Sequence, residues 1–199
     1  MQLIGMLDSP YVRRVAIAMR LLGLEFEHRK LSVFRDWDTF RAINPVVKVP
    51  TLVCADGTVL VESELVLRHA EDMAGRSLWP SSAAHRRAAL RTSGLAMVVM
   101  EKAVALHYEH ELRPPERRHP PWIERVGGQL RAALDGLAEE TGDWPGEAPG
   151  MADINAAVAW RFTQLKMPAE VPAGDWPRLA GFSRQAEQHP AFRAFAPDE

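Results

Sequence analysis

The stretch "QLIGMLDSPYVRRVAIAMRLLG", residues 2–23, places a short apolar run directly before a helical pattern. The run "QLIGM" is typical of a buried strand. Ser9 and Pro10 follow, and serine is a favoured N-cap while proline is favoured at the first helical position. Apolar side chains then recur at helical spacing until Gly23 ends the pattern. The stretch predicts a strand followed by a well-capped helix. It leaves open whether Ser9 is only a cap or also a functional hydroxyl.

The chain continues to alternate strand and helix patterns up to about residue 76. The predicted elements after the first helix are a strand in "FEHRKLSV" (26–33), a short helix in "DWDTFRAI" (36–43), two strands in "PTLVCADGTVLVES" (50–63) and a helix in "SELVLRHAEDMAG" (63–75). Asp56-Gly57 is a strong hairpin signal between the two strands, and Ser63 is the expected cap of the last helix. Strands joined through a helix should pair in parallel, and a hairpin pairs antiparallel. The sequence therefore predicts an α/β domain with a small, mixed, four-stranded sheet.

The second part of the chain shows helical patterns without a convincing strand. The helical stretches are residues 83–112, 122–140, 151–165 and 176–188. The segment "SLWPSS", residues 77–82, reads as a linker between the two parts. We therefore expect an N-terminal domain over residues 1–76, a linker over 77–82 and an all-α C-terminal domain over 83–199.

Composition and charge narrow the function classes. No apolar run approaches the roughly 18 residues that span a bilayer, and no signal peptide is evident. The single cysteine, Cys54, excludes an internal disulfide framework and a multi-cysteine metal site. A net charge of −2 provides no basic field for nucleic acid. We therefore expect a cytoplasmic protein that binds neither nucleic acid nor membranes.

Five segments, in their order along the chain, resemble the cytosolic glutathione transferase family. They are "SPYVRRVAIA" (9–18), "NPVVKVPTLV" (44–53), "VESELVL" (61–67), "GMADINAAVA" (150–159) and "HPAFRAF" (189–195). The resemblance covers almost the whole chain. It implies a thioredoxin-like N-terminal domain, an all-helical second domain and a cytoplasmic, two-fold homodimer. It also implies an enzyme, a glutathione S-transferase of the serine type acting in detoxification, with glutathione as co-substrate and without a separate cofactor. Its reaction would be conjugation of glutathione to an electrophile or a related lyase, isomerase or peroxidase reaction.

The same resemblance assigns glutathione-binding roles to individual residues. Val49 and Pro50 would form a cis peptide that leaves the Val49 backbone free for the tripeptide, although a strand-edge proline is the alternative. Glu62 would bind the γ-glutamyl ammonium. The Ser63 hydroxyl would bind the neighbouring carboxylate, beyond a plain role as helix cap. Lys48 would reach the glycyl carboxylate, with an exposed surface lysine nearly as well supported.

Ser9 is the expected catalytic residue, because its hydroxyl would hold the glutathione thiolate. A thiol with a pKa of about 8.5 is only about 3% ionised at pH 7. Lowering that pKa to about 6.5 takes roughly 2.7 kcal/mol. One hydrogen bond to a charged sulfur supplies about 1.5–3 kcal/mol, and a helix N-terminus adds about 0.3–1 kcal/mol. No general base is therefore required. Arg13, one turn along the helix, has two interpretations: it adds positive potential at the thiolate, or it faces solvent, which is the favoured expectation.

The second substrate would be a small hydrophobic electrophile in a pocket lined by Leu7, Phe34 and Tyr108, residues that core packing explains equally well. His107 and His110 do not complete a metal site, so no metal is expected. The alternative function is a non-catalytic adaptor of the same fold that resembles the stringent-starvation proteins and acts through protein–protein contacts. Titration with glutathione would distinguish the two functions.

Two positions depart from the family pattern. Gly150 stands where Ser or Thr is common, three residues before Asp153. We expect Asp153 still to accept a hydrogen bond from backbone N–H groups near the start of its helix. Val47 stands where the family often has glycine.

Overall fold

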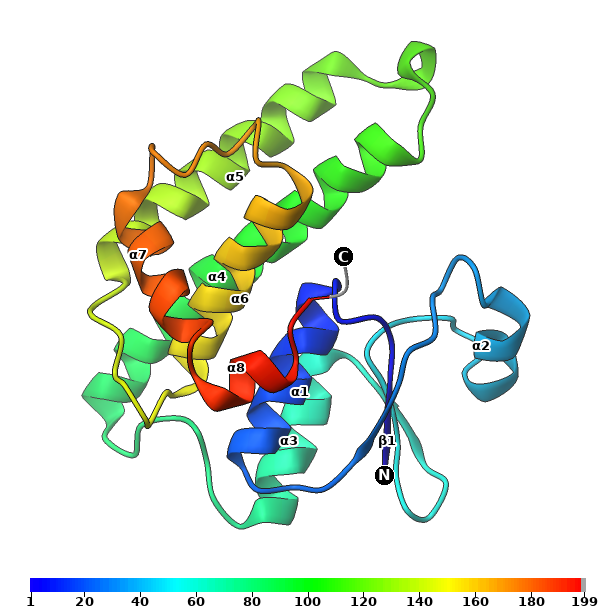
Figure 1. The fold of residues 1–199 in the computed structure, drawn as a ribbon. Coiled ribbons are helices and arrows are strands. Elements are labelled where there is room, and N and C mark those ends of the chain that lie inside the picture. Colours follow the sequence, from blue (N-terminus) through cyan, green and yellow to red (C-terminus); the bar gives the residue numbers. More distant parts are fainter. Residues whose placement is uncertain (198–199) are drawn as a thin grey trace. The chain divides into compact units, whose positions relative to one another are not determined.

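Four short strands form one mixed sheet in the first part of the computed structural model, which describes residues 1–197 (Figure 1). The strands are β1 (Gln2–Ile4), β2 (Glu27–Arg29), β3 (Thr51–Val53) and β4 (Val59–Val61), in the order β2-β1-β3-β4. β1 pairs parallel with β2 and antiparallel with β3, and β3 pairs antiparallel with β4. The predicted mixed sheet is confirmed, including the parallel crossover and the hairpin.

Helices lie on both sides of this sheet. They are α1 (Pro10–Leu21), α2 (Trp37–Ile43) and α3 (Ser63–Ala74). Figure 1 shows α1 and α3 side by side along one face, with α2 beyond the other face. Apolar side chains of β1, β3, α1 and α3 are fully or almost fully buried and form the core of this layer: Leu3, Ile4, Leu52, Val15, Ile17, Val66 and Leu67. This arrangement is a thioredoxin-like fold.

The remaining helices are α4 (Ala83–Glu111), a short 3₁₀ turn η1 (Pro115–Arg117), α5 (Pro120–Glu140), α6 (Met151–Lys166), α7 (Pro177–Ala186) and α8 (Pro190–Ala194). α4 packs against both α5 and α6, and α6 packs against α7. No strand occurs in the described residues after β4, as the sequence predicts. The structure thus combines a thioredoxin-like unit with an all-helical unit. None of the helices described over residues 1–197 is long and apolar enough to cross a membrane.

The two compact units divide the chain differently from the sequence pattern. Among the described residues, Met1–Leu78 and residues 188–197 form one unit, and Trp79–Glu187 forms the other. The segment that contains α8 therefore packs with the thioredoxin-like elements, where it contacts α1. Sequence grouping assigned it to the helical domain because a short helix carries no signal of its packing partner.

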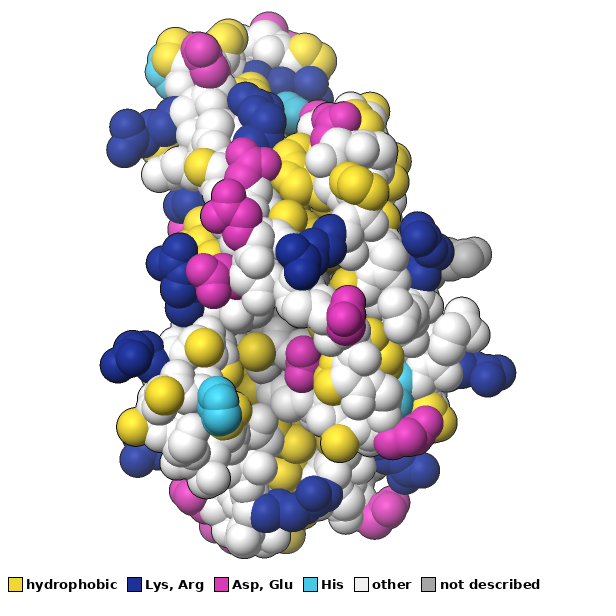
Figure 2. All heavy atoms as spheres, turned by 90° about the vertical axis from the view of Figure 1, so that its left-hand side faces the viewer, with side chains coloured by type: hydrophobic (Ala, Val, Ile, Leu, Met, Phe, Trp, Pro, Cys, Tyr) yellow, Lys and Arg dark blue, Asp and Glu magenta, His cyan; other side chains and the backbone are white. Residues whose placement is uncertain are grey.

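Charged side chains of both signs are interspersed over the face of the molecule shown in Figure 2. This distribution agrees with the net charge of −2. No field of a single sign dominates this face, so long-range electrostatic steering of a polyanion gains nothing from it.

Candidate active site

Ser9 lies at the junction of β1 and α1, where it is the N-cap of the helix. Its backbone is extended (φ −69°, ψ 122°), and its Oγ accepts from the Val12 N–H at 3.5 Å. This distance is at the outer limit of a hydrogen bond, so the cap is weak. The side chain is half-buried. A hydroxyl that accepts in this way keeps its own hydrogen for donation to another group.

Gly5 brings the start of α1 close to the loop that precedes β3. Its φ is +140°, and a Cβ atom there would lie 2.6 Å from Val12 Cγ2 and 2.9 Å from Val49 Cγ1. His28 Nε2 donates to the Gly5 carbonyl oxygen at 2.8 Å. Only glycine tolerates this backbone and this close approach. Sequence analysis missed Gly5, although a glycine directly after the first strand was the available signal.

The Val49–Pro50 peptide bond is cis, as the family resemblance implies. The loop before it is held by buried Asn44, whose Nδ2 donates to Thr51 Oγ1 at 2.9 Å. Thr51 Oγ1 in turn donates to the Lys48 carbonyl oxygen at 2.6 Å. Within residues 1–197, no hydrogen bond engages the backbone N–H or C=O of half-buried Val49. Both groups can therefore pair with an extended peptide ligand.

Val47 has a φ of 50° in the same loop. A β-branched residue at positive φ is a backbone outlier, which explains why glycine suits this position. The loop nevertheless keeps its shape, because the Val47 N–H donates to the Asn44 carbonyl oxygen at 2.9 Å.

The start of α3 differs from the prediction. Glu62, not Ser63, is the N-cap, with φ 69° and ψ 117° and without a side-chain cap bond. Ser63 is the first helical residue and is only 3% exposed. The sequence pattern favoured serine as the cap because its short hydroxyl usually serves that purpose. Here the hydroxyl is instead committed to a partner on α1.

That partner is Arg14, which sequence analysis missed. Arg14 Nη1 donates to Ser63 Oγ at 2.8 Å, and Nη2 donates to Glu64 Oε2 at 3.0 Å. The pKa of Arg14 lies below its ordinary value, because burial lowers it by more than the Glu64 carboxylate raises it. Local pattern held no signal for this role, because an arginine beside an apolar helix face is usually exposed.

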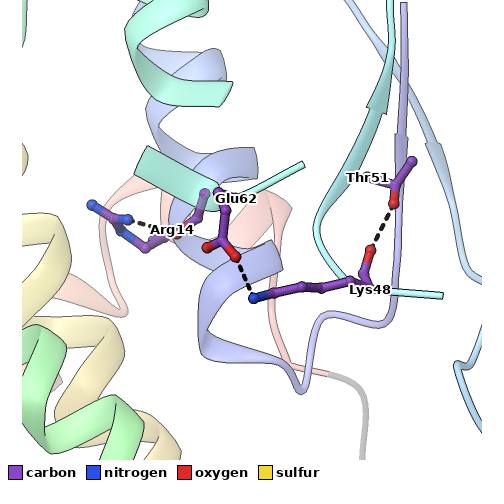
Figure 3. Close-up of polar contacts among 5 residues, drawn as sticks. Arg14, Lys48, Thr51 and Glu62 are labelled. Carbon is purple, nitrogen blue, oxygen red and sulfur yellow. Dashed lines mark hydrogen bonds and ion pairs between the residues drawn. The ribbon is translucent and has the colours of Figure 1, made fainter. Parts of the chain in front are cut away.

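Lys48 and Glu62 form an ion pair, drawn in Figure 3 beside Arg14 and Thr51. Both side chains are about half exposed. The pair joins two residues that the resemblance assigns to opposite ends of the tripeptide. The structure thus brings together the cis-proline loop and the start of α3, while Gly5 connects the same loop to the start of α1.

Arg13 is buried, which corrects the expectation that it faces solvent. Its Nε donates to the Phe195 carbonyl oxygen at 2.8 Å, and its guanidinium lies 5.7 Å from the centre of the Phe192 ring. The Phe195 ring stacks on Phe26 at 5.6 Å. Arg13 therefore fastens the C-terminal segment to α1, a long-range contact that local sequence pattern does not encode.

The residues expected to line an electrophile pocket differ in exposure. Leu7 is buried, whereas Phe34 and Tyr108 are 56% and 41% exposed. Leu7 and Phe34 belong to the thioredoxin-like unit, and Tyr108 lies on α4 of the helical unit. Their assignment to one pocket stays a prediction.

Other polar groups contribute to structure. Cys54 follows β3 and lies 3.7 Å from His69 Nε2, and burial together with the Asp56 carboxylate raises the pKa of its thiol. A raised pKa leaves it mostly protonated and unreactive.

Asp153 Oδ2 accepts from the Gly150 N–H at 2.8 Å, as expected, and burial raises the pKa of this carboxyl. No group of three metal-ligating side chains occurs in the described part of the chain.

Comparison with known proteins finds similarity to glutathione S-transferases. Residues 3–77 match the family described as glutathione S-transferase, N-terminal domain. Maleylacetoacetate isomerase of Pseudomonas aeruginosa is 29% identical over 195 residues, which cover 92% of this chain and 90% of that protein. A glutathione S-transferase from Methylobacterium radiotolerans in complex with glutathione sulfonate superposes with a TM-score of 0.90 at 27% identity, covering 100% of this chain and 95% of that one. A glutathione transferase family member from Pseudomonas fluorescens with bound glutathione gives a TM-score of 0.83 at 26% identity and covers 100% and 99% of the two chains.

Proposed function

Because this chain belongs to the cytosolic glutathione transferase family of enzymes, we propose that it binds reduced glutathione and activates its thiol through Ser9. One observation carries the proposal: three segments of a single unit offer complementary groups to one extended tripeptide. These groups are the Ser9 hydroxyl at α1, the unengaged Val49 backbone beside Pro50, and the Glu62–Ser63 start of α3.

Each end of glutathione has a counterpart among these groups. Glu62 would receive the γ-glutamyl ammonium, and the Ser63 hydroxyl with the first N–H groups of α3 would receive its carboxylate. Lys48 would attract the glycyl carboxylate, so ligand binding would exchange the Lys48–Glu62 ion pair for two pairs with the ligand. The Val49 backbone would hold the cysteinyl residue and direct its sulfur to Ser9.

The chemical step follows from thiol ionisation. The bound thiol releases its proton to solvent, and the Ser9 O–H donates to the resulting thiolate. The thiolate forms a carbon–sulfur bond with a small hydrophobic electrophile. The displaced electron pair departs with a leaving group or, in an addition, takes up a proton. Leu7, Phe34 and Tyr108 are the proposed walls for that electrophile.

A second reaction is favoured by the similarity to maleylacetoacetate isomerase. The same thiolate would add to a carbon–carbon double bond conjugated to a carbonyl, which moves the electron pair onto the carbonyl oxygen. Rotation about the resulting single bond, followed by expulsion of the thiolate, returns glutathione unchanged and leaves the other geometric isomer. Isomerisation without glutathione consumption distinguishes this reaction from conjugation.

Calorimetric titration with reduced glutathione is the direct test of the binding proposal. We expect a Kd in the micromolar to millimolar range, as is usual for a metabolite substrate. A titration without heat, together with an unchanged melting temperature at tens of millimolar glutathione, would favour the adaptor function. Conjugation and isomerisation assays with an electrophile panel then separate the two enzymatic reactions.

We further propose a two-fold homodimer, which is the commonest closed assembly. Sedimentation should give a species of about twice the chain mass of 22.2 kDa at micromolar concentration. A species at the chain mass itself would contradict this proposal. The cytoplasmic location expected from the single cysteine stays a prediction.

A further inference from the structure

Arg14 is a full positive charge in the interior of the thioredoxin-like unit. Its side chain is 0% exposed, and it lies between buried neighbours on α1. An arginine in such a place is stabilised only if other groups satisfy its N–H donors. Two of those donors point to the first turn of α3, where they meet Ser63 and Glu64. Figure 3 shows the Arg14 side chain beside the start of this helix.

The contact fixes the direction of the Ser63 hydroxyl. A guanidinium can only donate hydrogen bonds, so Ser63 Oγ must accept from Arg14 Nη1. The single hydroxyl hydrogen of Ser63 is then left to be donated elsewhere. A ligand that meets this hydroxyl must consequently offer an acceptor, and a carboxylate is the strongest acceptor in a peptide.

The charge around Arg14 also favours an anion. Glu64 is the acidic partner, but its side chain is 61% exposed, so water screens much of its charge. The first N–H groups of α3 add positive potential, because α3 has no side-chain cap. Ser63 thus lies between a buried cation and an uncapped helix end.

We propose that Arg14 is a positioning residue that fixes Ser63 as a hydrogen-bond donor and thereby makes the start of α3 selective for the α-carboxylate of a γ-glutamyl ligand. This inference rests on the proposed binding of glutathione and adds the determinant of substrate class. The site accepts γ-glutamyl compounds that carry a free α-carboxylate and discriminates against those that lack it. Glu62 recognises the ammonium independently of Arg14.

Two tripeptides separate these roles. 4-Aminobutyryl-cysteinyl-glycine lacks the α-carboxylate of glutathione, and glutaryl-cysteinyl-glycine lacks the α-ammonium. Calorimetry gives the Kd of each peptide and of glutathione for the wild type and its variants. The wild type should bind the peptide without the carboxylate at least about tenfold more weakly than glutathione, the factor expected from one charged hydrogen bond.

Arg14→Met should remove most of that discrimination. Its Kd for glutathione should rise about tenfold or more, whereas its Kd for 4-aminobutyryl-cysteinyl-glycine should change less than about twofold. Discrimination against glutaryl-cysteinyl-glycine should be retained, since that peptide tests Glu62. Arg20→Met is the matched control, because Arg20 is a largely exposed arginine on the same helix.

Arg14→Gln is the second variant, should Arg14→Met fail to fold. The glutamine amide is neutral and can accept a hydrogen bond from Ser63 as well as donate one, so it no longer enforces the direction of the hydroxyl. Like Arg14→Met, the Arg14→Gln protein should bind glutathione and 4-aminobutyryl-cysteinyl-glycine with similar Kd values. Arg14→Lys, which keeps a charged donor that cannot accept, should restore part of it.

The outcomes are distinct. A wild type that binds none of the three peptides overturns the proposed function itself. A wild type that binds glutathione, with Arg14 variants that weaken glutathione and 4-aminobutyryl-cysteinyl-glycine by equal factors, overturns only the role of Arg14. If Arg14→Gln discriminates against 4-aminobutyryl-cysteinyl-glycine as strongly as the wild type does, the role of Arg14 is likewise overturned.

Discussion

Helix α1 begins at a residue with ordinary backbone angles and a side-chain cap, whereas helix α3 begins at a residue with a φ of 69° and no side-chain cap. Ser9 satisfies one N–H of its helix, although at 3.5 Å. Glu62 satisfies none with its side chain and holds a conformation that L residues rarely adopt. The start of α1 thus has an unstrained backbone and a weak side-chain cap. The start of α3 has a strained backbone and no side-chain cap, at the place where we propose that a ligand binds.

A third helix start, in the helical unit, serves as a reference. At α6 the Asp153 carboxylate accepts from the Gly150 N–H at 2.8 Å, and we assign no ligand to it. The lack of a side-chain cap does not by itself distinguish the start of α3, because α2, α5 and α7 also begin without one. What distinguishes it is the positive φ of Glu62, and strained backbone of this kind clusters at functional sites.

The largest effect is expected from Ser9→Ala. Loss of a preorganised donor to the thiolate should lower turnover by about 10- to 1,000-fold at neutral pH. Stability should fall only at the low end of about 0.5–2 kcal/mol, because the cap bond is long. Steady-state kinetics and urea unfolding measure both quantities. Ser82→Ala is the matched control, since Ser82 caps α4 through the His85 N–H at 3.3 Å. It should lose similar stability and keep full turnover.

Glu62→Gln should act on binding. Removal of one charged hydrogen bond to the ammonium should cost about 1.5–3 kcal/mol, which raises the Kd for glutathione roughly 10- to 150-fold. Calorimetry measures the change. Glu25→Gln, the same substitution at an exposed residue beyond the end of α1, should leave the Kd unaltered. Equal Kd values for the wild type and Glu62→Gln would remove Glu62 from the site.

Glu62→Gly should stabilise the fold while it weakens binding. Relief of positive-φ strain contributes about 1–3 kcal/mol, and the extra freedom of glycine in the unfolded chain offsets about 0.5–1 kcal/mol of it. We expect a net gain of about 1 kcal/mol in the free energy of unfolding, measured in urea. Ser9→Gly should instead lose a few tenths of a kcal/mol. A destabilised Glu62→Gly protein would end the contrast between the two helix starts.

Asp153→Asn tests how the carboxylate at the start of α6 changes the free energy of unfolding with pH. Burial raises the pKa of Asp153 in the folded state, so the native protein binds more protons here than the unfolded chain does. This contribution to stability is present below the ordinary carboxyl pKa and is lost as pH rises through the raised value. The wild type should therefore lose stability relative to Asp153→Asn as pH rises from acid to neutrality, and glutathione binding should not change. Urea unfolding across that range would contradict this if the difference were constant.

Local pattern predicted much of this fold. The apolar run before Ser9, the Asp56-Gly57 turn and the helical periodicity after residue 83 correspond to β1, the β3–β4 hairpin and the helical unit. The hairpin and the helices depend on interactions between residues that are close in sequence, so local pattern predicts them. β1 was recognisable as a short apolar run, although its pairing partners lie 25 or more residues away. The cis bond at Val49–Pro50 was reached through family resemblance alone.

Long-range contacts were not predictable in the same way. The buried states of Arg13 and Arg14 depend on partners 179 or more and 49 residues away, which local pattern does not specify. The sequence predicted Ser63 as the N-cap of α3, but Glu62 holds that position. The Ser63 hydroxyl accepts from Arg14, a contact that the sequence did not predict. The docking of α8 on α1 depends on the same kind of distant pairing.

The role of Ser9 is tested most sharply by measuring the ionisation of bound glutathione. The thiolate absorbs in the ultraviolet, and its absorbance against pH gives the pKa of the bound thiol in the wild type and in Ser9→Ala. We expect a wild-type pKa well below the ordinary value of about 8.5, and a rise of one unit or more in Ser9→Ala. Turnover of the variant should recover in part at higher pH, where solvent ionises the thiol unaided. Identical titration curves for the two proteins would leave Ser9 as a helix cap and contradict the account.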